Sequence, residues 1–130
     1  MILQNIYLDK WRWYIRVFYD ISSDEIEDIL DELTGDGCPE RLVYELRRVI
    51  RSKNTGFTYT DMKHRFSDLI IRKTTSSKEF RNTLDHEKLH LILHIAEANG
   101  ISLHSEDFTY LCGELGEQMH PISKKFICDK

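Results

Sequence analysis

The alternation of apolar and polar side chains in residues 11–21 predicts a β-strand. Trp13, Ile15, Val17 and Tyr19 project to one face of an extended chain, while the other face carries two arginines among aromatic side chains. β-Branched and aromatic residues of this kind favour strands. A face that is apolar along its whole length indicates a strand in the middle of a small sheet.

Apolar residues at helical spacing predict four helices in the rest of the chain, and two short apolar runs predict further strands. Two of the helices begin with a Ser-x-x-Glu capping box, at Ser22 and at Ser76. We expect the third helix to be the longest and the most buried. The predicted helices cover about residues 22–34, 39–52, 77–99 and 105–119, and the two further strands cover residues 57–60 and 67–72.

Together these elements predict an α+β fold, in which a small antiparallel or mixed sheet of about three strands packs against about four helices. The chain has 130 residues, of which 41% are hydrophobic, and this length suits one hydrophobic core. We therefore expect a single domain that spans residues 1–130.

Charge and the N-terminal sequence limit the classes of function. A formal net charge of -4 and a pI near 5.8 argue against a nucleic-acid partner, and the basic cluster Arg47, Arg48, Arg51 and Lys53 is interpreted as a solvated helix face. Charged residues interrupt the apolar pattern of residues 1–20, so neither a signal peptide nor a membrane span is expected. Three widely spaced cysteines suit reduced thiols, and we expect a cytoplasmic protein without a membrane partner.

The candidate chemistry lies in the helix predicted for residues 77–99. His86 and His90 are four residues apart, so both imidazoles project from one face of a helix about one turn apart. With Glu87 they form the H-E-x-x-H pattern, in which two neutral imidazoles bind zinc and the carboxylate accepts a proton from the metal-bound water. We expect this polar strip to line a cleft between apolar flanks. The alternative interpretation is a half-buried polar seam that forms hydrogen bonds with loops.

A catalytic zinc ion needs a third protein ligand, which one helix cannot supply. Glu106 opens the next predicted helix, and the turn over residues 99–104 can direct that helix back so that Glu106 approaches both histidines. His104 and Asp107 are the alternative third ligands.

Two further side chains near the motif have candidate roles. Tyr110 lies one helical turn beyond Glu106, where its phenol could donate a hydrogen bond to a developing oxyanion, although a tyrosine packed between helices is the simpler interpretation. His94 lies about 12 Å along the helix axis from His86, too far for one ion to bind both. We interpret His94 as a supporting or packed side chain.

Residues 83–115 resemble a known family. His86-Glu87-x-x-His90, a short turn containing Gly100, and Glu106 at the start of Glu-Asp-Phe-Thr-Tyr-Leu are similar to the two-helix active core of zincin-like metallopeptidases of the gluzincin type. The chain is especially similar to small bacterial and phage-type proteins in which an H-E-x-x-H helix is followed by an E-x-x-x-Y-L helix. The resemblance implies a zincin-like fold around the motif helix. It also implies that His86, His90 and Glu106 bind Zn²⁺ and that Glu87 is the general base.

Two classes of function follow from these observations. In the first, the chain is a zinc metallopeptidase that binds a peptide or protein substrate by edge pairing with the strand at residues 57–60 or 69–72. In the second, it is a non-catalytic accessory or interaction protein of a phage or mobile element, with a vestigial metal site. The complete motif favours the first class. The small size of the chain, and the lack of a second subdomain to wall a peptide cleft, favour the second.

Overall fold

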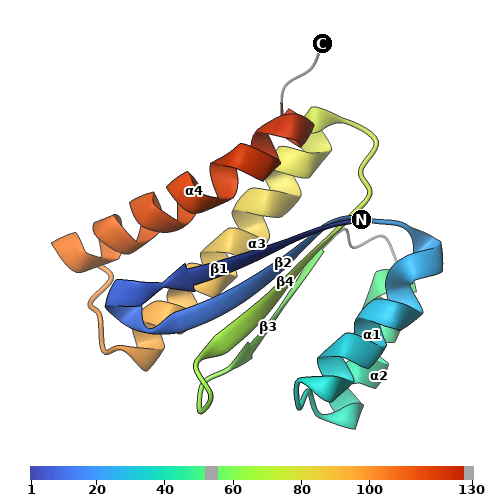
Figure 1. The fold of residues 1–130 in the computed structure, drawn as a ribbon, viewed down its shortest axis with the longest axis horizontal. Helices are drawn as coiled ribbons and strands as arrows, with labels where there is room; N and C mark the ends of the chain where they lie inside the picture. The colour runs from blue at the N-terminus through green and yellow to red at the C-terminus, as the bar shows by residue number, and fades with distance from the viewer. Residues whose placement is uncertain (52–55, 128–130) are drawn as a thin grey trace.

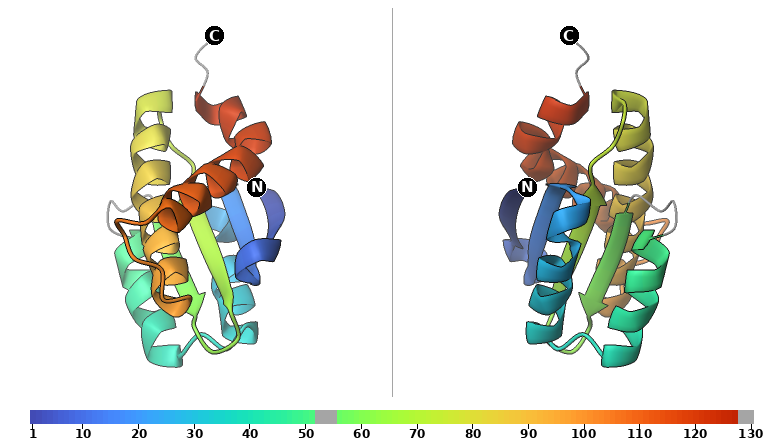
Figure 2. Two further views of the ribbon diagram at one scale, coloured as in Figure 1. Left: turned by 90° about the vertical axis from the view of Figure 1, so that its left-hand side faces the viewer. Right: turned by 90° about the vertical axis from the view of Figure 1, so that its right-hand side faces the viewer.

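The computed structural model describes residues 1–51 and 56–127, and in this part of the chain four strands form one sheet with two α-helices against each face (Figure 1). Figure 2 shows that α1 (Ile26–Gly35) and α2 (Glu40–Arg51) cover one face, while α3 (Ser77–Ala98) and α4 (Glu106–Ile127) cover the other. The predicted α+β fold with a mixed sheet and four helices is confirmed. Within the described residues, no helix is both long enough and apolar enough to span a membrane.

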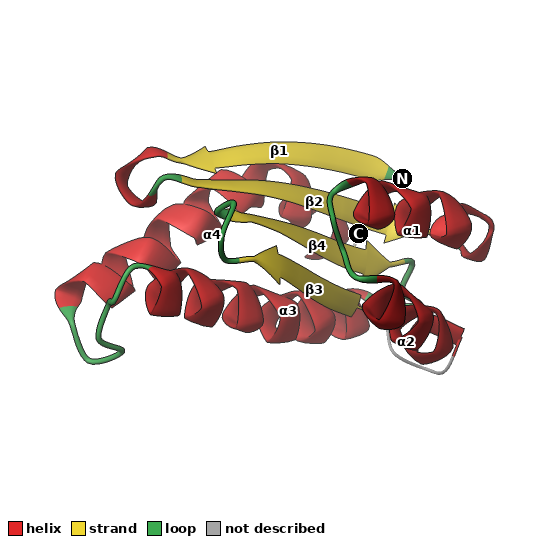
Figure 3. Ribbon diagram, turned by 90° about the horizontal axis from the view of Figure 1, so that it is seen from below, coloured by secondary structure: helices red, strands yellow, loops and turns green. Residues whose placement is uncertain are grey.

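The sheet places its strands in the order β1-β2-β4-β3. β1 (Ile2–Leu8) pairs antiparallel with β2 (Trp13–Ile21), and β3 (Gly56–Asp61) pairs antiparallel with β4 (Phe66–Arg72). The two interior strands β2 and β4 are parallel, so a crossover must join them, and the segment containing α1, α2 and β3 provides it. β3 is therefore an edge strand, and it lies next to α3 (Figure 3).

Strand β1 is the element that the sequence prediction missed. About three strands are predicted, whereas the described residues form four. Ile6 and Leu8 are buried and the intervening Tyr7 is exposed, so a period of two is present in β1. The polar residues Gln4 and Asn5 interrupt the apolar pattern, and an edge strand with one solvated face leaves a weak signal in the sequence.

The interior strand β2 matches its prediction. Trp13, Ile15 and Val17 are fully buried against the layer formed by α3 and α4. Near the end of β2, Asp20 adopts a φ of 59° and the pairing with β4 changes register. Ile21 consequently turns to the opposite face, where it joins the core beneath α1 and α2.

Helix α4 continues beyond its predicted end near Met119. It passes through Pro121, although proline removes one hydrogen bond from a helix interior. The extra turns bring Phe126 against the rings of Tyr19 and Phe80, at centroid distances of 6.0 and 4.9 Å. Packing of this aromatic cluster offsets the cost of the proline. The residues around Pro121 do not reveal this packing, because Tyr19 and Phe80 are distant in the sequence. As a result α4 has 22 residues, the same length as α3. The expectation that α3 is longer than every other helix is therefore wrong.

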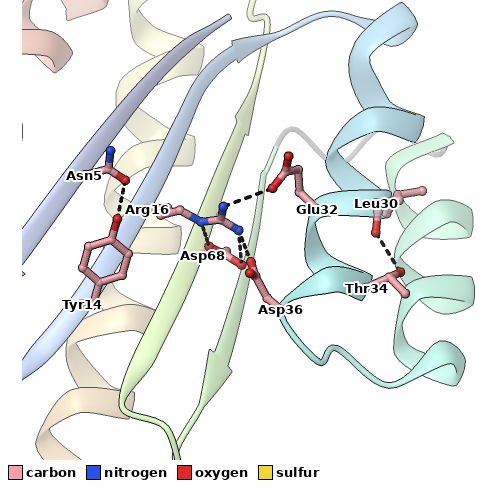
Figure 4. Close-up of polar contacts among 8 residues, drawn as sticks. All are labelled: Asn5, Tyr14, Arg16, Leu30, Glu32, Thr34, Asp36 and Asp68. Carbon is pink, nitrogen blue, oxygen red and sulfur yellow. Dashed lines mark hydrogen bonds and ion pairs between the residues drawn. The ribbon is translucent and has the colours of Figure 1, made fainter.

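An ion-pair cluster joins β2, β4 and α1 on the face away from α3 (Figure 4). Arg16 Nε donates a hydrogen bond to Asp68 Oδ1 at 3.0 Å, and the same guanidinium pairs with Glu32 at 3.2 Å and with Asp36. The Asp68 side chain is completely buried, and this burial raises its pKa although Arg16 opposes the shift. Burial also lowers the pKa of Arg16, but Asp68 and Glu32 raise it more. The guanidinium therefore compensates a carboxylate that lies in the core.

Replacement of Arg16 tests this compensation. Arg16→Ala should lower the free energy of unfolding by about 3–5 kcal/mol, because it leaves the Asp68 carboxylate buried without its cation. Urea unfolding curves measure the change. Adding Asp68→Asn to Arg16→Ala should restore part of the loss, since no uncompensated charge then remains in the core. A double variant no more stable than the single one would contradict this explanation.

Arg47→Ala is the matched control. Arg47 donates two hydrogen bonds of 2.9 Å to Glu27, which links α2 to α1, but both side chains are solvent-exposed. The midpoint of unfolding should therefore change little. Arg47 belongs to the basic cluster noted in the sequence, and Lys53 of that cluster lies outside the described residues.

Candidate metal centre on helix α3

Helix α3 carries the candidate centre and lies along β3 at one edge of the sheet (Figure 3). It begins at Ser76, whose Oγ accepts a hydrogen bond from Glu79 N at 3.1 Å, and it ends just before Gly100, which has a φ of 65°. One flank of α3 packs into the core. The apolar residues of that flank are Phe80, Leu84, Leu91, Ile92, Ile95 and Ala96.

His86 and His90 are exposed on the remaining side of α3, with their Nε2 atoms 3.3 Å apart. A carboxylate oxygen of Glu87 completes a group whose three potential ligand atoms all lie within 4.8 Å of one another. No other group of this kind occurs in the part of the chain that the structure describes. The helix thus brings together the three residues of the motif, and both imidazoles are exposed to solvent.

The separation of the two imidazole nitrogens fits a zinc ion. Two nitrogen ligands at about 2.0–2.1 Å from zinc, at a tetrahedral angle, lie about 3.3–3.4 Å from each other. Imidazole is a preferred ligand of borderline-soft cations such as Zn²⁺. The distance between the two nitrogens is therefore compatible with one shared ion.

Glu87 is turned toward strand β3 and is only 8% exposed. Thr58 Oγ1 lies 3.1 Å from Glu87 Oε1 and 3.1 Å from the main-chain oxygen of Glu87, so the hydroxyl can donate to either acceptor. Gly56 provides the necessary space, since a Cβ atom there would lie 2.7 Å from Glu87 Cγ and 2.8 Å from Thr83 Cγ2. The close approach of β3 therefore holds the carboxylate beside the histidines.

A chain of hydrogen bonds links His94, in the C-terminal half of α3, to the sheet. Its Nδ1 atom lies 2.7 Å from Thr60 Oγ1, which lies 2.7 Å from Ser67 Oγ. Trp13 Nε1 in turn donates to Ser67 Oγ at 3.0 Å. Burial lowers the pKa of His94, and the neighbouring His90 lowers it further. The arrangement agrees with the interpretation of His94 as a packed side chain that supports the helix.

The structure does not bring a predicted third ligand to the two histidines. Glu106 opens α4, but His90 lies about 12 Å along the axis from the end of α3, where the chain turns into α4. Asp107 pairs instead with Lys10 at 3.4 Å. Neither these two residues nor His104 belongs to the group of potential ligand atoms around the motif. The turn is long enough to reverse the chain, but it leaves the start of α4 level with the end of α3.

Tyr110 also lies away from the motif, beside the turn between β1 and β2. Its side chain is 60% exposed, and the Lys10 ammonium lies 5.3 Å from the centre of its ring and 5.2 Å from that of Trp11. These residues line a shallow hollow of about 650 Å³ together with the exposed side of α4. A hydrogen bond from Tyr110 to a substrate at the histidines therefore has no support from this placement.

The contact of β3 with the motif helix is not predicted from the sequence. Gly56, Thr58 and Thr60 occupy alternate positions of this strand, and all three contact α3 at or beside Glu87 and His94. The pattern of small and hydroxyl-bearing residues with a period of two is visible in the sequence. Its meaning depends on tertiary packing, because only the fold places the edge strand against the motif helix.

Substitution of Gly56 tests the close approach of β3 to α3. Gly56→Ala should lower the free energy of unfolding by about 1–3 kcal/mol, because the new methyl group would overlap Glu87 and Thr83. Gly113→Ala in α4 is the control, since a Cβ atom there meets nothing within 4 Å and alanine favours a helix by about 1 kcal/mol. Urea unfolding of both variants measures the difference, and equal stability of Gly56→Ala and wild type would refute the contact.

The environment of His94 predicts how stability depends on pH. A pKa lowered in the folded state means that the unfolded chain binds the proton more readily. The stabilisation is therefore complete above the ordinary histidine pKa of about 6.5 and is lost as the pH falls through the lowered pKa. Unfolding curves between about pH 8 and pH 5 should show a steeper decline for wild type than for His94→Gln. Parallel curves would contradict the prediction.

Comparison with known proteins assigns neither a family nor a function to the chain. No protein-family model, curated protein or solved structure matches the chain. The arrangement of His86, Glu87 and His90 is therefore the observation from which a function can be argued.

Proposed function

We propose that the chain is a zinc-dependent peptidase in which His86 and His90 hold the ion and Glu87 is the general base. The observation that carries the proposal is the 3.3 Å separation of the two Nε2 atoms, with a carboxylate oxygen of Glu87 within 4.8 Å. This separation is what two ligands of a tetrahedral zinc ion require. A bound zinc ion would acidify water and polarise a substrate carbonyl.

The side chains around the motif suit the proposed chemistry. Glu87 accepts the proton of the attacking water and returns it to the leaving amine, and Thr58 orients its carboxylate by a hydrogen bond. The edge strand β3 lies beside Glu87, so its main chain is the surface on which an extended peptide can pair. β4 cannot serve in this way because it lies between β2 and β3. Neither Glu106 nor Tyr110 has a part in this scheme.

A second candidate is a non-catalytic interaction protein with a metal site, the class of accessory protein that the sequence resemblance suggests for a phage or mobile element. The exposure of both imidazoles favours it, as does the position of Glu106 outside the group of potential ligands. Catalytic zinc sites usually have three protein ligands and a shaped cavity. In this candidate the metal would shape a surface and Glu87 would have only a structural role.

Three variants separate metal binding from catalysis. His86→Ala should abolish binding of zinc and the increase in melting temperature that zinc produces, because that increase depends on binding to the folded state. Glu87→Gln should retain zinc but lose about two or more orders of magnitude in peptide turnover, because the amide cannot accept the proton. His64→Ala removes an exposed histidine in the β3–β4 connection and should change neither property.

The measurements are zinc content, calorimetric titration with zinc, and cleavage of a peptide library by each variant. Zinc-loaded wild type that cuts no peptide beyond those cut by Glu87→Gln would refute the peptidase and leave the interaction protein. Failure of wild type to bind zinc would refute the metal site itself.

A further inference from the structure

We infer that a second copy of this chain completes the metal site, giving a dimer in which one zinc ion joins His86 and His90 of both copies. This inference rests on the proposed metal site, and it identifies the partner that supplies the remaining ligands. In the dimer all four ligands are imidazoles, and two α3 helices lie across each other at the ion.

One copy of the chain lacks two ligands of a tetrahedral zinc ion. His86 and His90 offer two nitrogens that suit one tetrahedral ion and face solvent. Among the described residues, Glu87 is the one further member of the group of potential ligands, and its carboxylate is turned to Thr58 between α3 and β3. Two positions of a zinc ion on the outer side of the imidazoles therefore remain for ligands from outside the chain.

In a symmetric dimer, His86 and His90 of the second copy supply those two ligands. A two-fold axis through the ion places the same pair of histidines opposite the first pair, and each copy presents the same surface to the other. Four nitrogen ligands form a closed tetrahedral set, which is characteristic of structural zinc sites. Because both imidazoles of one copy come from a single helix, two helices are sufficient to build the complete set.

The exposed side of α3 also has the sequence pattern of a helix that contacts another helix. Asn82, His86, Leu89 and Leu93 follow one another at intervals of four, three and four residues, which keeps them on one stripe. None of the four is an aspartate, glutamate, lysine or arginine. Leu89 is 51% exposed and Leu93 is half-buried, so both have apolar surface to bury against a second copy. The core and α4 use a different flank of α3, which leaves this stripe available.

The dimer would be an inactive form of the proposed peptidase. A zinc ion with four imidazole ligands has no position for water or for a substrate carbonyl, whereas an active ion needs an open position. The α3 surface of the second copy would also cover the approach to Glu87. Dimer formation and hydrolysis would therefore compete for the same ion.

Sedimentation of the full chain under reducing conditions, with and without added ZnCl₂, tests the inference. We expect a monomer without zinc and a dimer with zinc, with half a zinc ion bound per chain and reversal by a chelator. His90→Ala should remain a monomer with zinc. Leu89→Asp should raise the dimer dissociation constant at least tenfold, because it places two like charges in the contact, and His104→Ala should behave like wild type.

The possible results separate the dimer from the metal site. A wild-type monomer that binds one zinc ion per chain would overturn the dimer and leave the proposed metal site in place. A chain that binds no zinc would overturn both. A dimer that persists with chelator or in His90→Ala would show that zinc and these histidines do not form the bridge. Circular dichroism of the zinc-free variants checks that each substitution at this exposed surface leaves the fold intact.

Discussion

The close contact between helix α3 and edge strand β3 determines where the candidate centre lies. Gly56 allows the strand to approach the helix, Thr58 binds the Glu87 carboxylate, and Thr60 binds His94. These contacts lie on one side of α3 and set its rotation about its own axis. With that rotation fixed, His86 and His90 face outward, so the same packing that buries the carboxylate exposes the imidazoles.

This division between a buried carboxylate and exposed imidazoles limits what the centre can do. A carboxylate that accepts a hydrogen bond from Thr58 is held in place for the proposed proton transfer. Imidazoles in solvent bind an ion readily but provide little exclusion of water, and a closed cavity is a common part of catalytic zinc sites. The proposed general base thus lies on the inner side of the candidate centre, and the proposed ligands of a zinc ion lie on its outer side.

The features that were predicted correctly depend on interactions between residues that are close in the sequence. The pairing of His86 with His90 depends on one turn of helix, and the burial of Trp13 and Ile15 depends on the alternation within one strand, so both were predictable. The position of Glu106 depends on how two helices end relative to each other, and no local pattern specifies this. Strand β1 was missed because Gln4 and Asn5 interrupt its apolar pattern. The continuation of α4 beyond Pro121 was missed because packing against distant residues stabilises it.

The parallel pairing of β2 with β4 has a consequence for how the chain folds. β1 with β2, and β3 with β4, are antiparallel pairs joined by short connections, so each can form from neighbouring residues. The contact between β2 and β4 instead joins Tyr14 to Phe66, and closing that long segment costs chain entropy before any contact across it is gained. We therefore expect the docking of the two hairpins to limit the rate of folding. The contact that places α3 against β3 belongs to the second hairpin and its following helix, so the surroundings of Glu87 can take shape before the sheet is complete.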